Sequence, residues 1–325
     1  MWFTYTQVEQ VKLGAVDHSE APHETTYFDM AGFPPMIHEA PQNTRIMERK
    51  SYCVIFEGML EHVTRCLTRK VSGNVIVTGN PGIGKSHFYL YCIFRLITRQ
   101  QDMVKRLPEF QLLLNCKDEY HLYDDVRKDF TSLSLADVKE QGLSSSRSVV
   151  RLINGNSDHF KPWSGVNVLF SSPGEADVKD LEKDNPRLFI MPLWTFHEVK
   201  EYNTLLKDGC DGLALTDSEL EEGFTVFGGI PRSIFSLDPE SERRKLEEII
   251  VSCDAGDVVE YVKSNYSVRQ SHFSERLLQM VPTPPHIERD RRCHLPLNTL
   301  AISCSLRWKT DTCRWVASFL ALLTP

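Results

Sequence analysis

The sequence predicts an α/β fold in which a parallel sheet carries helices on both faces and a smaller helical domain follows. Short apolar runs alternate with longer segments of helical periodicity up to Trp194. Such interleaving is typical of a parallel sheet whose crossover connections are helices. After Trp194 mainly helical patterns recur, which indicates a second domain.

The composition is that of an ordinary globular protein, and it limits the partners. The 325 residues, 41% of them hydrophobic, suffice for one large domain or two modest ones with a packed core. The formal net charge of -7 argues against broad non-specific binding to nucleic acid, although it is compatible with a local basic patch.

The cysteines indicate a reducing intracellular compartment. Their number is odd and several stand within apolar runs, so buried reduced thiols are expected. No pair has C-x-x-C spacing, so the usual zinc-site pattern is absent. The N-terminus has no signal-peptide pattern and the apolar run at 315–323 is too short to cross a bilayer, so we expect a soluble chain with no membrane partner.

The α/β core is expected over residues 45–194. Residues 1–44 carry prolines without a clear period, and we expect a leader or extended arm with little regular structure. Apolar spacings of three and four predict a helix over 45–69, and the nearly all-round apolar segment 85–98 predicts a buried one. Strands are predicted at 74–78, 110–115, 148–153, 166–171 and 188–191.

A helical lid domain is expected over residues 195–280. The segment Thr216-Asp217-Ser218-Glu219 resembles a capping box, which marks the start of a helix. The remaining residues, 281–325, form an irregular tail. Helices of the lid are predicted at 196–206, 217–227, 231–235, 241–253 and 257–265.

The loop after the first core strand carries the most specific pattern. Its sequence is Gly79-Asn80-Pro81-Gly82-Ile83-Gly84-Lys85-Ser86, which matches the Gly-x4-Gly-Lys-Ser/Thr pattern of a phosphate-binding P-loop. Glycines let the backbone turn tightly and approach phosphates, and N–H groups of the loop and of the following helix can surround an anion. The predicted fold is therefore a P-loop NTPase three-layer core followed by a lid.

These residues predict a site for ATP or GTP with Mg²⁺. We expect Lys85 to reach the β- and γ-phosphates and Ser86 to bind the metal ion. Pro81 lacks an N–H group and can only stiffen the loop. The residues expected to contact the nucleotide are Gly79, Asn80, Pro81, Gly82, Ile83, Gly84, Lys85, Ser86 and His87.

Hydrolysis also needs an acidic residue to hold the water shell of the metal, and its identity is open. The best second strand ends in Asn154, whose amide can accept a hydrogen bond but brings no charge. Asp158 is one substitute, and Asp124 with Asp125 is another. Each of these acids is also compatible with a solvated surface carboxylate.

Two later segments supply further candidate residues for the nucleotide site. Ser171 and Ser172 end a predicted strand at the sheet edge where ligands of open α/β sheets bind, so either could sense the γ-phosphate; a Ser-Ser-Pro-Gly turn is the alternative. Gly229-Ile230-Pro231-Arg232 separates two predicted helices. Arg232 could stabilise charge on a transferring phosphate, or the segment could be a plain inter-helix turn.

An ordered set of segments resembles the NTPase module of the Crinkler effectors of oomycetes and fungi and the related retrotransposon hot spot proteins. The resemblance implies an ATPase core of the AAA+/STAND-like kind with a helical lid. It also implies a secreted effector that acts inside a host cell, often in the nucleus, on a host protein or nucleic acid. The family usually carries an Asp where Leu152-Ile153-Asn154-Gly155 stands in this sequence. The matching segments are Glu48–Tyr52, Val77–Ser86, Phe170–Pro173, Met191–Trp194 and Gly229–Arg232.

Three hypotheses therefore stand. The first is a Mg-dependent NTPase whose nucleotide state moves the lid, with Lys85, Asn154, Asp158 and Arg232 as catalytic candidates. The second is a nucleotide-binding switch or scaffold without significant hydrolysis, which Asn154 favours. The third is a nucleic-acid-acting effector, supported by the resemblance and by three arginines of the tail, Arg289, Arg291 and Arg292. The overall acidity of the chain favours a solvated basic tail as the interpretation of these arginines.

Overall fold

The chain divides into two compact units, and the structure is a computed structural model. The first unit comprises Met1–Thr78 and Gly84–Met191, and the second comprises Gly79–Ile83 and Pro192–Pro325. Within the described part of the chain, no helix is long and apolar enough to cross a membrane. The structure describes residues 10–13, 25–29, 45–99, 101–116, 119–155, 163–172, 186–207, 214–252, 279–282 and 291–294.

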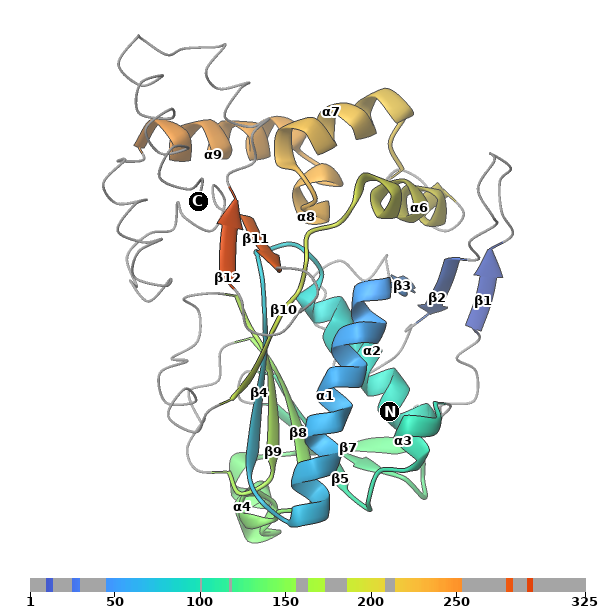
Figure 1. The fold of residues 1–325 in the computed structure, drawn as a ribbon, viewed down its shortest axis with the longest axis vertical. Coiled ribbons are helices and arrows are strands. Elements are labelled where there is room, and N and C mark those ends of the chain that lie inside the picture. Colours follow the sequence, from blue (N-terminus) through green and yellow to red (C-terminus); the bar gives the residue numbers. More distant parts are fainter. Residues whose placement is uncertain are drawn as a thin grey trace. The chain divides into compact units, whose positions relative to one another are not determined.

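A mostly parallel sheet forms the centre of the first unit (Figure 1), which confirms the predicted α/β fold. Its strand order is β10-β4-β9-β8-β5-β6-β7, and the strands from β10 to β5 are parallel. β6 and β7 extend the β5 edge as an antiparallel hairpin that the sequence analysis did not anticipate. The strands are β4 Gly73–Thr78, β5 Gln111–Cys116, β6 Glu119–Asp124, β7 Asp129–Leu133, β8 Val149–Asn154, β9 Val166–Phe170 and β10 Arg187–Ile190.

Helices cover both faces of this sheet. Phe88 of α2 (Lys85–Thr98) packs edge-on against Phe170 of β9, with ring centroids 5.7 Å apart. Val138 of α4 (Leu135–Glu140) packs in a cluster with Val149 of β8. Phe170 of β9 is paired with Asn154 of β8, so their side chains lie on the same face of the sheet. Asn154 and Val149 lie an odd number of positions apart along β8, so their side chains lie on opposite faces. α2 and α4 therefore occupy opposite faces of the sheet.

The first helix covers the same face as α2. α1 (Lys50–Arg69) buries a stripe of side chains spaced by three and four residues, as the periodicity predicts. Figure 1 shows α1 and α2 side by side against the sheet. A short helix, α3 (Asp102–Lys105), and a 3-10 turn, η1 (Leu143–Ser145), complete the helical segments of this unit that the structure describes.

A small antiparallel sheet precedes α1, contrary to the expectation of little regular structure before residue 45. It contains β1 (Gln10–Leu13), β2 (Thr25–Asp29) and β3 (Arg45–Met47). The fully buried Phe28 lies 4.4 Å from Phe94 of α2, centroid to centroid. The helix expected from residue 45 begins instead at Lys50, because residues 45–47 pair with β2.

The second unit contains helices after Pro192. Thr216 and Glu219 form the predicted capping box at the start of α7, with the Thr216 N–H 2.8 Å from Glu219 Oε2. The predicted helix at 257–265 lies outside the described residues. Arg291 and Arg292 belong to a β-hairpin, and Arg289 is not described. The elements are α6 Phe196–Lys207, α7 Asp217–Phe227, α8 Pro231–Ile234, α9 Pro239–Ser252, β11 Gln279–Pro282 and β12 Arg291–His294.

Candidate nucleotide-binding site

The P-loop sequence occupies the connection from β4 to α2, as its mechanism requires. β4 ends at Thr78 and α2 begins at Lys85. Gly82 has φ +83° and Gly84 has φ +97°, in the left-handed region that costs other residues roughly 1–2 kcal/mol. Two glycines of the motif therefore meet a backbone requirement of the turn itself.

The start of α2 is suited to an anion. Gly84 is its N-cap, no side chain caps the helix, and its first turn contains no acidic residue. The first N–H groups of a helix lack intrahelical acceptors, and the helix dipole adds positive potential there. Lys85, Ser86 and His87 lie in this turn and are partly exposed. The geometry favours binding of phosphate at this end.

The carboxyl ends of the neighbouring strands meet at one edge of the sheet. The N–H of Ser171, just after β9, donates to Val77 O at 3.1 Å, and the N–H of Gly155, just after β8, donates to Phe170 O at 2.8 Å. Ser86 Oγ lies 3.5 Å from Asn154 Oδ1. The structure therefore brings together the candidate metal ligand and the residue that ends the second strand.

The end of β8 carries no charge. Asn154 is 7% exposed and has a neutral amide, and Gly155 after it has no side chain. Asp158 lies outside the described residues. Elsewhere in the described ranges, no group of three or more His, Cys, Asp or Glu side chains could hold a metal ion. The described part of the site thus offers Mg²⁺ a hydroxyl and an amide. These groups bind Mg²⁺ weakly unless phosphate oxygens of a nucleotide also coordinate the ion.

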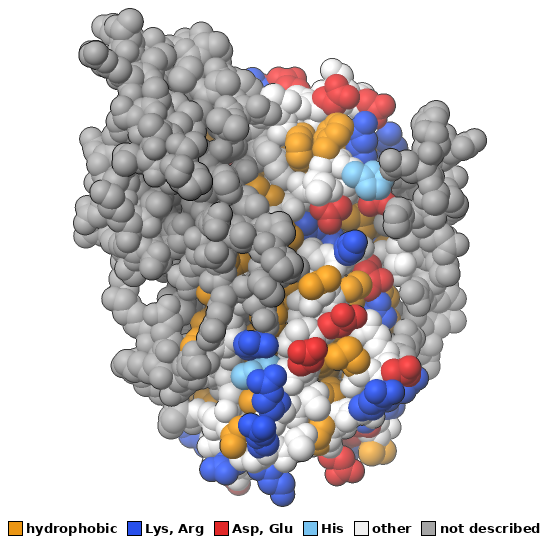
Figure 2. All heavy atoms as spheres, viewed as in Figure 1, with side chains coloured by type: hydrophobic (Ala, Val, Ile, Leu, Met, Phe, Trp, Pro, Cys, Tyr) orange, Lys and Arg blue, Asp and Glu red, His pale blue; other side chains and the backbone are white. Residues whose placement is uncertain are grey.

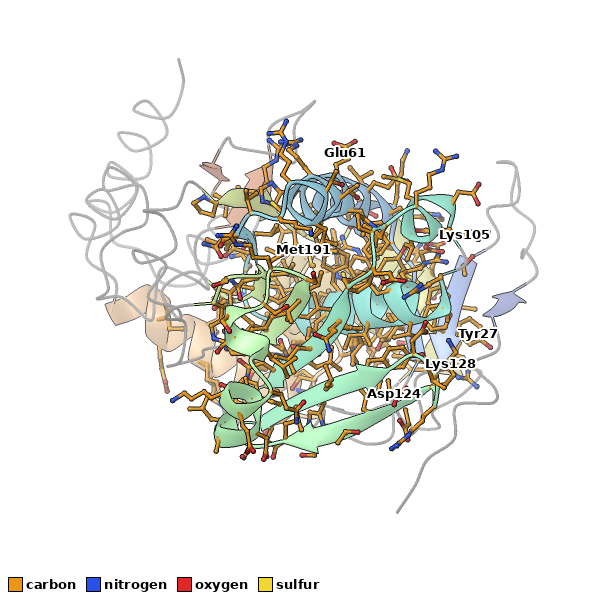
Figure 3. All side chains as sticks on the ribbon, turned by 90° about the horizontal axis from the view of Figure 1, so that it is seen from below. Tyr27, Glu61, Lys105, Asp124, Lys128 and Met191 are labelled. Atoms are coloured by element: carbon orange, nitrogen blue, oxygen red, sulfur yellow. The ribbon has the colours of Figure 1, made fainter. Side chains whose placement is uncertain are left out.

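Asp124 and Asp125 lie away from this edge. β6 runs antiparallel to β5, so its end at Asp124 lies at the opposite edge, where β5 begins. Asp124 Oδ1 accepts hydrogen bonds from the N–H groups of Val126 and Arg127 in the hairpin turn. Figure 3 shows Asp124 and Lys128 near each other and distant from Met191, which follows β10.

The backbone bonds of Asp124 lower the pKa of its carboxyl group, as expected for a carboxylate that closes a turn. Asp125 contacts Lys128 Nζ at 2.6 Å and has a lowered pKa mainly for that reason. Both side chains therefore have local structural partners.

The serines after β9 are buried at the phosphate edge. Ser171 is 2% exposed and Ser172 is 6% exposed, and Ser171 Oγ donates to the Ser172 carbonyl at 3.3 Å. The residues that would complete the alternative Ser-Ser-Pro-Gly turn, from 173 onward, are not described. The position of Ser172 at this edge is compatible with a role beside the phosphates.

Arg232 lies directly beside the tip of the loop in the second unit. Its backbone N–H donates to Gly82 O at 3.3 Å. A Cβ atom on Gly82 would lie 2.9 Å from Arg232 Cβ and 3.0 Å from Ile230 Cγ2. Pro231 is the first residue of α8, as the sequence suggests. The glycine at position 82 therefore also permits close approach of this segment.

Two aromatic residues contact the loop, although sequence reasoning did not assign them to the site. The Trp194 indole Nε1–H donates to Ile83 O at 2.7 Å. The Tyr52 hydroxyl donates to Gly84 O at 3.1 Å. Both residues lie in segments that carry the Crinkler resemblance, which was the only sequence signal that could have identified them.

The face of the molecule in Figure 2 has mixed charge. Lys and Arg side chains gather along the lower left of the described surface, and over the rest of it they alternate with Asp and Glu side chains. Among the described residues, exposed ion pairs join Lys105 with Asp102 and Arg243 with Glu222. On this face the described residues do not form a broad basic surface of the kind expected for non-specific nucleic-acid binding.

Comparison with solved structures finds matches of low similarity. A mutant RuvB from Thermotoga maritima matches with a TM-score of 0.33 and 15% identity, over 66% of this chain and 64% of that one. The replication initiator DnaA, bound to AMPPCP and single-stranded DNA, matches with a TM-score of 0.34 and 12% identity, over 67% and 70%. Drosophila ORC bound to DNA matches with a TM-score of 0.31 and 13% identity, over 78% and 86%.

The matched part is thus less than two-thirds of the RuvB chain. Similarities this low say nothing about activity. No protein-family model matches the chain. No curated protein matches it either.

Proposed function

We propose that this protein binds a nucleoside triphosphate with Mg²⁺ at residues 79–86 and hydrolyses it slowly, so that it acts as a nucleotide-dependent switch. The observation that carries the proposal is the loop between β4 and α2, with Gly82 and Gly84 in the left-handed region and an uncapped helix start. This arrangement offers backbone N–H groups and a lysine to phosphates without an opposing acid in the first turn.

Slow turnover is supported by the residues at the end of β8. Asn154 contacts Ser86, where a carboxylate would usually anchor the water shell of the metal. An amide brings no charge, and Gly155 supplies no group to orient an attacking water. Bound triphosphate would therefore dissociate intact more often than it is hydrolysed.

The experiment is an acid-quench measurement of bound ATP with protein in excess. Wild-type protein with ATP and Mg²⁺ should retain most of the nucleotide as triphosphate after many binding lifetimes. Lys85→Ala should not bind and serves as the control for contaminating ATPases. Rapid turnover that is lost in Lys85→Ala would overturn the switch proposal and favour the hydrolytic alternative.

Hydrolysis remains the second candidate, and Asp158 is the residue that favours it. It follows Asn154 by four residues, so a loop could bring its carboxylate to the metal. In that case Asp158→Asn would abolish the Lys85-dependent turnover while leaving triphosphate binding intact.

A Crinkler-like effector setting is a further proposal, and it rests on the ordered sequence segments. Two of them, Met191–Trp194 and Gly229–Arg232, contact each other through the Trp194 N–H, which donates to Gly229 O at 3.0 Å. Expression of a fluorescent fusion inside plant cells tests this setting. Nuclear accumulation that depends on Lys85 would support it, and a uniform distribution unaffected by Lys85→Ala would count against it.

A further inference from the structure

Carbonyl groups at the tip of the loop accept hydrogen bonds from outside the loop. The Trp194 indole donates to Ile83 O at 2.7 Å, and the backbone N–H of Arg232 donates to Gly82 O at 3.3 Å. Gly84 O accepts from the Tyr52 hydroxyl at 3.1 Å and from the Phe88 N–H at 2.9 Å. Three successive carbonyl groups are therefore held by donors.

Peptide geometry turns these bonds into a constraint on the N–H groups. In a planar trans peptide, the C=O of one residue and the N–H of the next point in opposite directions. A carbonyl held on one side directs the next N–H group to the other side. The N–H groups directed in this way belong to Ile83, Gly84 and Lys85, which lie in the part of a P-loop that surrounds phosphate.

We propose that Trp194 is a positioning residue that preorganises the phosphate-binding N–H groups through the Ile83 carbonyl. This inference rests on the proposed nucleotide binding. Trp194 acts through the loop backbone and needs no contact with the nucleotide. Because the loop is already oriented before phosphate arrives, binding incurs a smaller ordering cost.

The indole is itself held on several sides, so it is a rigid donor. Trp194 is 4% exposed, and its ring packs edge-on against Tyr202 with centroids 5.3 Å apart. Tyr202 packs in the same manner against Phe235, also at 5.3 Å. A Cβ atom on Gly229 would lie 2.1 Å from the Trp194 carbonyl oxygen, so the two backbones are in direct contact.

The Ile83 carbonyl depends on this donor. Ile83 is fully buried, so water cannot readily replace the indole N–H as a partner. Gly84 O differs, because it would keep the helical bond from Phe88 if the Tyr52 hydroxyl were removed. Removal of one donor at each site should therefore have unequal effects, and Tyr52→Phe is a matched control.

The test is calorimetric titration with Mg-ATP and with Mg-tripolyphosphate, a probe that has only the phosphates. Trp194→Phe keeps an aromatic ring and removes the N–H. It should raise the dissociation constants of both ligands about tenfold, which corresponds to the net contribution of one hydrogen bond. Tyr52→Phe should raise them less than about threefold. An equal loss for both ligands marks an effect on the phosphate site, because tripolyphosphate has neither base nor sugar. An unchanged binding stoichiometry and melting temperature of the unliganded variant exclude general destabilisation as the cause.

The controls separate this inference from the proposed function. If wild type binds, Lys85→Ala does not, and Trp194→Phe binds as wild type, the positioning role is overturned and nucleotide binding stands. A loss for Mg-ATP without a loss for tripolyphosphate also overturns the positioning role. If wild type binds neither ligand, both the inference and the proposed function are overturned.

A second measurement covers the case in which Trp194→Phe does not fold. In wild-type protein with ¹⁵N-labelled tryptophan, the indole N–H of Trp194 should exchange with solvent slowly before any nucleotide is added. Exchange as fast as that of an exposed indole would show that the donor is not preformed, and would overturn the proposal.

Discussion

Replacement of Asn154 by aspartate tests how the metal is held. The Asn154 side chain is nearly buried, and its Oδ1 lies 3.5 Å from Ser86 Oγ. A Mg²⁺ ion held by that hydroxyl would lie within a few ångströms of a carboxylate at this position. The substitution therefore places a negative charge close to the metal with almost no change in shape.

The size of the effect follows from two opposing contributions. Two unit charges 4 Å apart interact by about 4 kcal/mol at an effective dielectric constant near 20, and a divalent ion doubles this to about 8 kcal/mol. Repulsion between the carboxylate and the triphosphate opposes this by several kcal/mol. A net gain of about 3 kcal/mol would tighten Mg-ATP binding roughly a hundredfold.

The sign of the effect should reverse without the metal. In EDTA, the new carboxylate repels the triphosphate, and ATP affinity of Asn154→Asp should fall by about tenfold or more below that of wild type. Calorimetric titration of both proteins with ATP, in Mg²⁺ and in EDTA, measures all four affinities. Equal affinities of the two proteins in both buffers would refute the placement of the metal beside Asn154.

Three further predictions concern packing and protonation. Gly229→Ala should lower the free energy of unfolding by about 2–4 kcal/mol in urea titrations, because the new methyl group would lie 2.1 and 2.6 Å from backbone atoms of Trp194. Gly155→Ala is the control, because its methyl group would enter open space, and it should lower the free energy of unfolding by only about 1 kcal/mol. Equal losses for the two variants would contradict the close approach of Gly229 to Trp194. Arg151→Lys should cost about 2–3 kcal/mol, because the buried guanidinium lies 4.0 Å from the Trp163 ring centroid and donates to Asn115 Oδ1; an unchanged urea midpoint would argue against this packing. Burial and the nearby Glu48 raise the pKa of Cys53 to about 11. The rate of Cys53 alkylation, followed by peptide mass spectrometry, should therefore rise about tenfold per pH unit from pH 7 to 10. A rate that levels off below pH 9 would contradict the raised pKa. Since the folded pKa lies above the ordinary value of 9.0, this thiol should stabilise the fold below pH 9 and lose that contribution as pH rises through 11.

The central strands and major helices could be predicted because their sequence patterns are local. The apolar runs that became β4, β8 and β9 are buried on nearly every residue, and α1 and α2 carry the expected periodicities. The β6–β7 hairpin was missed because its residues are mostly half-buried and mix polar with apolar side chains. β2 was missed because its key contact, Phe28 against Phe94, joins residues far apart in sequence.

The site could be predicted only where one continuous segment supplies it. The P-loop, its neighbouring strand and its helix follow one another in the chain, so the motif and its context were visible together. The contact of Ser86 with Asn154 depends on the sheet order, in which β9 separates β4 from β8. The bond from Trp194 to Ile83 joins residues 111 positions apart, and no spacing rule indicates it.

The most direct test of nucleotide binding is the dissociation constant of Mg-ATP for wild-type protein and for Lys85→Ala, measured by calorimetry under the same conditions. Lys85 is the first residue of α2 and follows Gly84. The substitution Lys85→Ala therefore removes a positive charge from the phosphate site and leaves the glycine turn in place. Wild type should bind one nucleotide per chain, and Lys85→Ala should bind at least about a hundredfold more weakly. Equal dissociation constants for the two proteins, or no binding by folded wild type, would contradict the account.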